Sequence, residues 1–166
     1  QIAPGYTHDA QCVVYEGPDA DYQGREICFN ANESQVNIAD VTDKANPETI
    51  TNVTYPRYGY VHQAWLTMDQ QYLLVDDETD EASGNVERTR TLVFDVSNLD
   101  NPELVKSYSG ETQSSDHNQY VVGDYSYQAN YKSGLRILDV SDPASPTVLG
   151  TVDAPDPSSL AELSAA

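Results

Sequence analysis

Short segments in which apolar and polar residues alternate recur along the whole chain, and turns rich in Asp, Ser, Asn, Gly and Pro separate them. This two-residue period predicts half-buried β-strands, and no window carries the sustained period of an amphipathic helix. Only the tail from Ser158 could form a helical turn or two, after a Pro-containing stretch typical of a linker. The pattern therefore predicts an all-β fold.

Three segments share one plan: residues 36–50, 91–105 and 135–149. In each, an alternating strand runs into Asp-Val-Ser/Thr, and a proline and a return strand follow. The repeated aspartates are Asp40, Asp95 and Asp139, spaced by 55 and then 44 residues. Asp and Ser side chains cap the backbone of tight turns, and Pro fixes the exit of the chain. Each segment therefore predicts a strand, a turn and a second strand.

A second repeated element starts at the three histidines of the chain, His8, His62 and His117, which are 54 and 55 residues apart. After each histidine come an apolar strand, a short turn and a second strand that ends in a polar pair. The second unit contains an insertion, residues 81–88, after that strand. Four short antiparallel strands in roughly 45 to 55 residues are the size of a β-propeller blade.

We therefore expect residues 1–153 to form three four-stranded antiparallel blades, approximately 6–55, 56–110 and 111–153, with 154–166 as a linker or tail. A closed propeller usually needs more blades than three, so the chain would be part of a six- or seven-bladed ring. Either missing N-terminal blades or a second chain would complete this ring. The open edges would otherwise expose unpaired strand backbone, which invites partners.

The sequence resembles the LVIVD-repeat proteins, and within them the exported bacterial group called choice-of-anchor B. The repeats at Asp40, Asp95 and Asp139 carry the resemblance, together with the segments "HDAQCVVYEG", "HQAWLT" and "SDHNQYVVGDYSYQANY". It covers about residues 6–152. The resemblance implies a propeller that is extracellular, attached to the cell surface or periplasmic, and it leaves the biochemical activity open.

The charge narrows the choice of partners. The chain has 27 acidic and 8 basic residues, a formal net charge of −19. Such a surface cannot neutralise a row of phosphates, so nucleic acid is excluded as a partner, and an anionic membrane surface is disfavoured. No apolar run approaches the roughly 20 residues needed to insert into a bilayer. The 39% hydrophobic content and 12 tyrosines speak against disorder.

The three histidines are the first candidate site. Equivalent positions on successive blades are related by rotation about the propeller axis, so the imidazoles of His8, His62 and His117 could converge on one end of the channel. They would then form a ligand set for Zn, Cu or another transition metal. Asp9 and Asp116 could orient two of the rings. The alternative is that each histidine bonds a neighbouring blade.

Oxygen ligands suggest a second possibility, calcium, which takes 6–8 oxygen atoms. Two groups of residues could supply them: the polar strand ends and an acidic loop unique to the first unit. These candidates are Asn32, Glu33, Asp76, Asp77, Glu78 and Asn130 at the strand ends, and Asp19, Asp21 and Glu26 in the loop. The alternatives are solvated strand ends with Asx turns, and an ordinary acidic surface loop.

The two cysteines, Cys12 and Cys28, lie on the strands that bracket the acidic loop. Antiparallel pairing of these strands would place them side by side, and an exported protein would favour a disulfide over free thiols. Two functions stay open. One is an exported binding or scaffold module that holds a divalent ion, Ca or a histidine-bound Zn or Cu; the other is a metalloenzyme, an oxidase or hydrolase. No nucleophile elbow or phosphate-binding loop is present, which favours the module.

Overall fold

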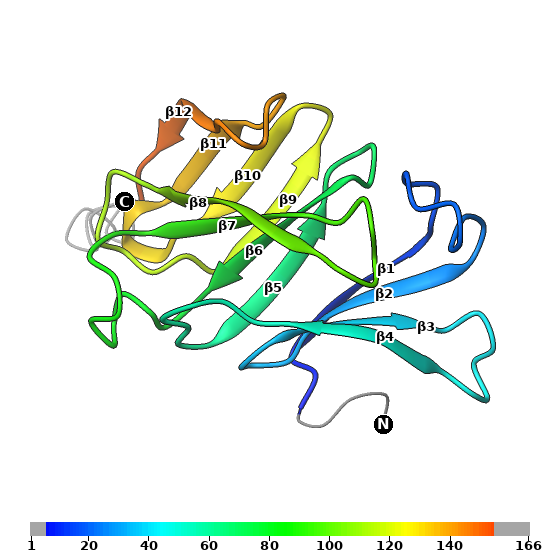
Figure 1. Ribbon diagram of the computed structural model, residues 1–166. Coiled ribbons are helices and arrows are strands. Elements are labelled where there is room, and N and C mark those ends of the chain that lie inside the picture. The colour runs from blue at the N-terminus through cyan, green and yellow to red at the C-terminus, as the bar shows by residue number, and fades with distance from the viewer. Residues whose placement is uncertain (1–5, 155–166) are drawn as a thin grey trace, which may run out of the picture.

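The computed structural model describes residues 6–154, which form three four-stranded antiparallel sheets (Figure 1). The first sheet contains β1 (Asp9–Val14), β2 (Glu26–Ala31), β3 (Val36–Asp40) and β4 (Glu48–Val53). The second contains β5 (Val61–Leu66), β6 (Tyr72–Asp77), β7 (Arg90–Asp95) and β8 (Glu103–Ser109). The third contains β9 (Asn118–Val122), β10 (Tyr125–Ala129), β11 (Leu135–Asp139) and β12 (Thr147–Val152), with a 3₁₀ turn, η1 (Tyr131–Ser133), between β10 and β11. The predicted helical tail lies outside the described residues.

Each sheet is a meander in which sequential strands are neighbours. Between sheets, β1 contacts β5, β2 contacts β5, and β5 contacts β9. The first strands of the three sheets therefore lie next to one another, with β5 in the middle, as the inner strands of successive propeller blades do (Figure 1). The predicted all-β fold with three four-stranded blades is confirmed.

The repeated aspartates close equivalent turns. An Oδ1 atom of Asp40, Asp95 and Asp139 accepts a hydrogen bond from the backbone N–H two residues later, at 2.9, 2.8 and 2.9 Å. A register shift interrupts the pairing of the third and fourth strands at the equivalent position of each sheet. The sequence repeat thus encodes both the turn and the following bulge, because the same side chains recur in the same register.

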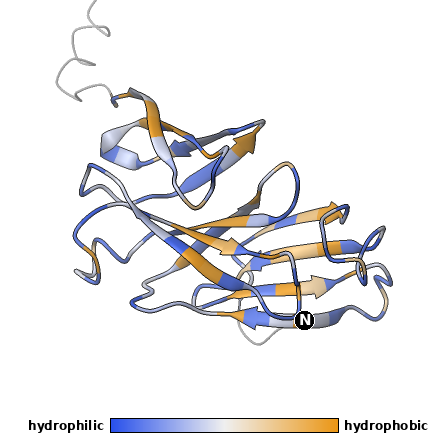
Figure 2. Cartoon of the chain, turned by 45° about the horizontal axis from the view of Figure 1, so that its top comes forward, coloured by the Kyte–Doolittle hydropathy of each residue, from blue (hydrophilic) through white to orange (hydrophobic). Residues whose placement is uncertain are grey.

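The two interfaces between the sheets differ in polarity. The first and second sheets enclose a large apolar cluster that includes Tyr15, Phe29, Ile38, Leu73 and Phe94, all buried. The second and third sheets share a smaller apolar cluster, and polar side chains are buried beside it. These polar residues include Gln63, Asp76, Thr91, Gln119 and Gln128, linked in part by hydrogen bonds. Coloured by hydropathy, the chain is apolar mainly along the strands and polar in the connecting loops (Figure 2).

The cysteines pair as predicted. Cys12 and Cys28 are direct partners in the β1–β2 register and form a disulfide, with 4.0 Å between their Cα atoms. The loop that they bracket is tied to the second sheet, because Asp19 Oδ2 accepts a hydrogen bond of 2.8 Å from the backbone N–H of Leu99. Among residues 6–154, no helix is long and apolar enough to cross a membrane.

Candidate functional site

The three histidines lie in a row at one end of the inner strands. The ring centroids of His8 and His62 are 4.4 Å apart, and those of His62 and His117 are 4.2 Å apart. His8 and His117 directly precede β1 and β9, whereas His62 lies within β5 at a register shift between Val61 and Gln63. The repeat thus brings together side chains from three sheets, with His62 in the centre of the row.

Burial differs along the row. His62 is 5% exposed, His117 is partly buried and His8 is exposed. Burial lowers the pKa of His62, and a positive charge on His117 or His8 would lower it further, while Glu78 acts in the opposite direction. The central imidazole is therefore held neutral near pH 7, the form in which a histidine nitrogen can bind a metal ion.

A carboxylate completes this cluster. The Oε2 atom of Glu78 lies 3.8 Å from Nε2 of His62, and its Oε1 atom lies 3.9 Å from Nε2 of His117. Ligand atoms of these three residues all lie within 4.8 Å of one another. Tyr131 donates a hydrogen bond to Oε1 of Glu78 and packs on the His117 ring, with centroids 4.9 Å apart. Two imidazoles and one carboxylate are a known ligand set for zinc and non-haem iron.

Asp9 and Asp116 flank the histidines in sequence but bond other groups. Asp9 Oδ2 accepts a hydrogen bond of 2.9 Å from Nε2 of Gln63. Asp116 is 1% exposed, its Oδ2 atom lies 3.4 Å from the backbone nitrogen of Asp77, and it faces the interior. Among the described residues, no imidazole donates a hydrogen bond to either carboxylate.

The predicted calcium residues at the strand ends do not form one group. Asp77 is fully buried and accepts hydrogen bonds from the Tyr55 hydroxyl and the backbone N–H groups of Gly59 and Tyr60. Asn32 and Asn130 are buried at the equivalent positions, each with an Oδ1 atom that has no partner within residues 6–154. The other members are Glu33, which is exposed, Glu78 beside the histidines, and Asp76, described below.

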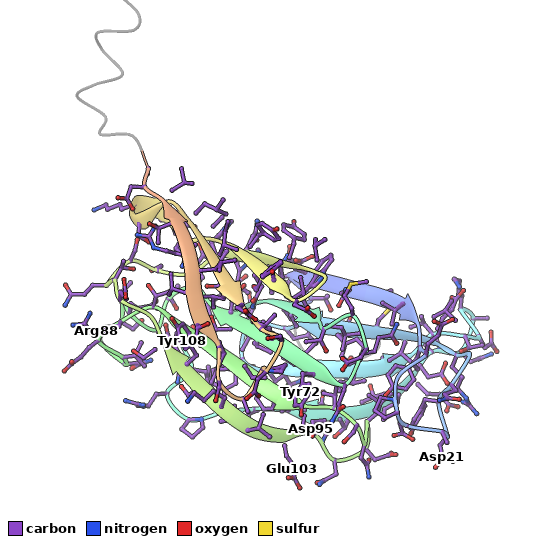
Figure 3. The ribbon with its side chains drawn as sticks, turned by 90° about the horizontal axis from the view of Figure 1, so that it is seen from above. Asp21, Tyr72, Arg88, Asp95, Glu103 and Tyr108 are labelled. Atoms are coloured by element: carbon purple, nitrogen blue, oxygen red, sulfur yellow. A yellow bond between two sulfur atoms is a disulfide. The ribbon has the colours of Figure 1, made fainter. Side chains whose placement is uncertain are left out.

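The acidic loop of the first unit makes local contacts. Besides its bond to Leu99, Asp19 accepts the backbone N–H of Asp21 through Oδ1 at 3.2 Å. Glu26 pairs with Lys44. Figure 3 shows Asp21 at the opposite end of the molecule from Arg88, which belongs to the insertion of the second unit.

At the border of the insertion, the structure brings together a group of carboxylates that sequence reasoning missed. Ligand atoms of Asp80, Glu81 and Asp116 lie within 4.8 Å of one another. Asp76 precedes Asp77, whose backbone nitrogen lies 3.4 Å from Oδ2 of Asp116, and the charge of Asp76 raises the pKa of Asp116 after the larger effect of burial. Burial likewise raises the pKa of Glu81, to about 8, and the charge of the neighbouring Asp80 adds to the shift. Only Asp76 was among the calcium candidates, and Asp116 was expected beside a histidine; adjacent acids in a unit-specific insertion were the available signal.

An open groove of about 430 Å³ runs beside both clusters. Glu78 and Tyr131 line it on the histidine side, Glu81 lines it on the carboxylate side, and Ser114 and Lys132 also border it. Small solutes and ions can therefore reach Glu78 and Glu81 from solvent through one opening.

The fold and the repeat define the class of protein: the chain is part of a β-propeller. Two solved structures share this fold. One is a periplasmic gluconolactonase of Pseudomonas aeruginosa, with a TM-score of 0.62 and 17% identity over 84% of this chain and 41% of that one. The other is a protein from Lactobacillus plantarum, with a TM-score of 0.65 and 17% identity over 81% of this chain and 41% of that one. The chain thus spans less than half of either structure.

Residues 118–154, which span the third sheet, match the family model for the LVIVD repeat. This match and the fold confirm the resemblance to LVIVD-repeat propellers. A search of curated proteins found no match.

Proposed function

We propose that this chain is a divalent-metal-binding module of an exported β-propeller, and that the metal is bound by His62, His117 and Glu78. The observation that carries the proposal is the convergence of these ligand atoms within 4.8 Å. Around a tetrahedral ion with ligand bonds of about 2.1 Å, ligand atoms are about 3.4 Å apart. The two distances from Glu78 to the imidazoles, 3.8 and 3.9 Å, need only a small contraction to meet this geometry.

His8 extends the site toward solvent. Its ring packs on His62 and is exposed, so it is placed to bind after a small side-chain rotation or to shield the ion from water. The order of the row predicts an order of effects: loss of His62 removes the central ligand, whereas loss of His8 removes a peripheral one. Zn²⁺ and Cu²⁺ suit such imidazole ligands, while Ca²⁺ prefers oxygen.

Metal analysis and titration test this proposal. The purified protein is stripped with a chelator, and Zn²⁺ and Co²⁺ are titrated by calorimetry and by the visible absorption of Co²⁺. We expect one ion per chain, loss of binding in His62→Ala and in Glu78→Gln, and a smaller loss in His8→Ala. An exposed change such as Asp124→Asn serves as the control. Stoichiometric binding that survives His62→Ala would overturn the assignment.

A metalloenzyme, an oxidase or hydrolase, is the second candidate. The groove beside Glu78 favours it, because a three-ligand site leaves a coordination position for water or substrate. The name of one structural neighbour, a periplasmic gluconolactonase, makes lactones a reasonable first panel. Turnover of lactones or esters by the metal-loaded protein, abolished in His62→Ala, would favour the enzyme; tight metal binding without turnover would favour the module.

The same module requires further blades. The outward face of the third sheet exposes apolar side chains, among them Val122, Tyr125 and Leu149, at 61%, 38% and 61% exposure. In a propeller such a face packs against the next blade. We propose that further blades of the same protein or a second chain cover it. Light scattering after size-exclusion chromatography tests the second-chain version, which a stable monomer would contradict.

The disulfide and the periplasmic location named for a structural neighbour support export of the protein. Alkaline phosphatase fused after residue 154 of the full-length protein would report the compartment, because the enzyme is active only after export. An inactive fusion would contradict export.

A further inference from the structure

The carboxylate group beside the histidines lacks the partners that buried charges require. Asp76, Asp80 and Asp116 are 1%, 0% and 1% exposed. Asp76 Oδ2, Asp80 Oδ1, Asp116 Oδ1 and both Oε atoms of Glu81 are buried and have no hydrogen-bond partner among residues 6–154. Buried charges in native proteins are paired or coordinate a metal, so these five unpartnered oxygens need an explanation.

The nearby guanidinium of Arg90 does not bond these unpaired oxygens. Arg90 donates from Nε to Oδ2 of Asp80 at 2.8 Å, and its Nη2 atom lies 2.6 Å from the same oxygen. Its remaining donors bond the carbonyls of Pro56 and Arg57 at 3.2 and 3.1 Å. The guanidinium thus bonds Oδ2 of Asp80 and leaves Oδ1 without a partner. It also lies 3.9 Å from Oδ2 of the buried Asp77, so its single positive charge cannot balance the carboxylates around it.

The repeat does not explain these carboxylates either. Asp76 pairs with Gln63, the residue after His62, and the equivalent pairs in the other sheets place Ala31 and Ala129 at the same position. Thr7 and Val61 precede the first two histidines where Asp116 precedes the third. Asp80 and Glu81 border the insertion of the second unit. All four acids are therefore departures from the shared plan, and ligand atoms of Asp80, Glu81 and Asp116 lie within 4.8 Å of one another.

We propose that Asp76, Asp80, Glu81 and Asp116 form a calcium site, separate from the histidine cluster. Five free carboxylate oxygens approach the 6–8 oxygen ligands of Ca²⁺, and water or backbone oxygens complete the set. Ligands on opposite sides of Ca²⁺ are about 4.8 Å apart, twice a bond of about 2.4 Å, and the ligand atoms of Asp80, Glu81 and Asp116 meet that limit. The absence of nitrogen or sulfur ligands separates this site from the histidine cluster in metal preference.

The groove provides the entry path. Glu81 is partly buried and lines the groove, whereas the three aspartates lie behind it. An ion entering from solvent meets Glu81 first. Bound calcium would join the insertion of the second unit to the segment before β9, and so hold the second and third sheets together across their polar interface.

Calcium titration of the chelator-stripped full chain tests the proposal. Calorimetry should give one Ca²⁺ per chain, and saturating CaCl₂ should raise the melting temperature, with MgCl₂ much less effective. Glu81→Gln and the isosteric Asp76→Asn should each weaken Ca²⁺ affinity at least tenfold. Glu87→Gln, which removes an exposed carboxylate from the same insertion, should leave it unchanged. Because Glu81 is only half buried, its variant keeps the test valid if Asp76→Asn fails to fold.

Two results would overturn the calcium site. One is a stripped protein that binds no Ca²⁺ at millimolar concentration and melts at the same temperature with or without it, as expected if protons neutralise the carboxyl groups. The other is equal Ca²⁺ affinity in Glu81→Gln and Glu87→Gln. His62→Ala should keep calcium binding while losing Zn²⁺, so failure of one site is distinguishable from failure of the other.

Discussion

The imidazole rings of His62 and His117 lie 4.2 Å apart, although 55 residues separate them in the chain. His62 lies near the start of β5 and His117 directly precedes β9, so the contact follows from the packing of β5 against β9. The carboxylate of Glu78 lies beside both rings. A propeller can therefore assemble a compact ligand set from residues one repeat apart, without any local sequence motif for metal binding.

The hydroxyl of Tyr131 should tune the histidine site. It bonds Glu78, which raises the pKa of Tyr131 to about 12, so the phenol stays protonated and donates at neutral pH. Loss of a group that orients a metal ligand typically weakens binding 10–100-fold. We expect Tyr131→Phe to weaken Zn²⁺ affinity at least tenfold in a competition titration. Tyr60→Phe is the matched control, because Tyr60 packs on His8 and its hydroxyl faces Glu33; equal losses in the two variants would argue against this role.

The metal-free protein should lose stability as the pH rises. The ordinary pKa of Glu81 is 4.5, and burial raises it to about 8 in the folded chain. Between these values the folded state binds more protons than the unfolded state, so this contribution is fully present below pH 4.5 and is lost toward pH 8. In urea titrations with chelator present, the free energy of unfolding of the wild type should fall relative to that of Glu81→Gln as the pH rises through this window. A difference that is constant with pH would contradict the raised pKa.

The disulfide should carry a measurable part of the stability. Cys12 and Cys28 are 16 residues apart in sequence, and a cross-link closing about 15 residues contributes about 3 kcal/mol in the loop-entropy model. We expect the double variant Cys12→Ser, Cys28→Ser to lower the free energy of unfolding by about this amount in urea titrations. Reduction of the wild type should produce a similar loss, and reduction of the double variant should produce none.

The repeat explains why the fold could be predicted. Asp40, Asp95 and Asp139 occupy equivalent turns, and an alternating strand leads into each of them, so the sequence contains the four-stranded unit three times over. The pairing of Cys12 with Cys28 followed from the same meander. These features are local or repeated, which is why sequence periodicity carries them.

The sites could be predicted only where they follow the repeat. The equivalent histidines were identifiable, but the proximity of Glu78 to two of them depends on how neighbouring sheets twist and pack. The carboxylate cluster was not predicted, because Asp80 and Glu81 border an insertion with no counterpart in the other units. The conformation of such a segment depends on tertiary contacts, here the ion pair of Asp80 with Arg90.

A glycine next to the carboxylate cluster gives a final test of how the insertion is positioned. A Cβ atom on Gly59 would lie 2.6 Å from Oγ1 of Thr79 and 2.7 Å from the backbone nitrogen of Asp80, closer than real contacts allow. Gly59 also donates its N–H to Asp77 at 2.7 Å. A shift of Gly59 away from Thr79 and Asp80 would therefore break this hydrogen bond. Gly59→Ala should therefore displace Asp80, weaken Ca²⁺ binding severalfold and lower the melting temperature. Gly150→Ala is the control, because no atom lies within 4 Å of its added Cβ. Calcium affinity that is unchanged in Gly59→Ala would show that the insertion can shift while its carboxylates keep their places.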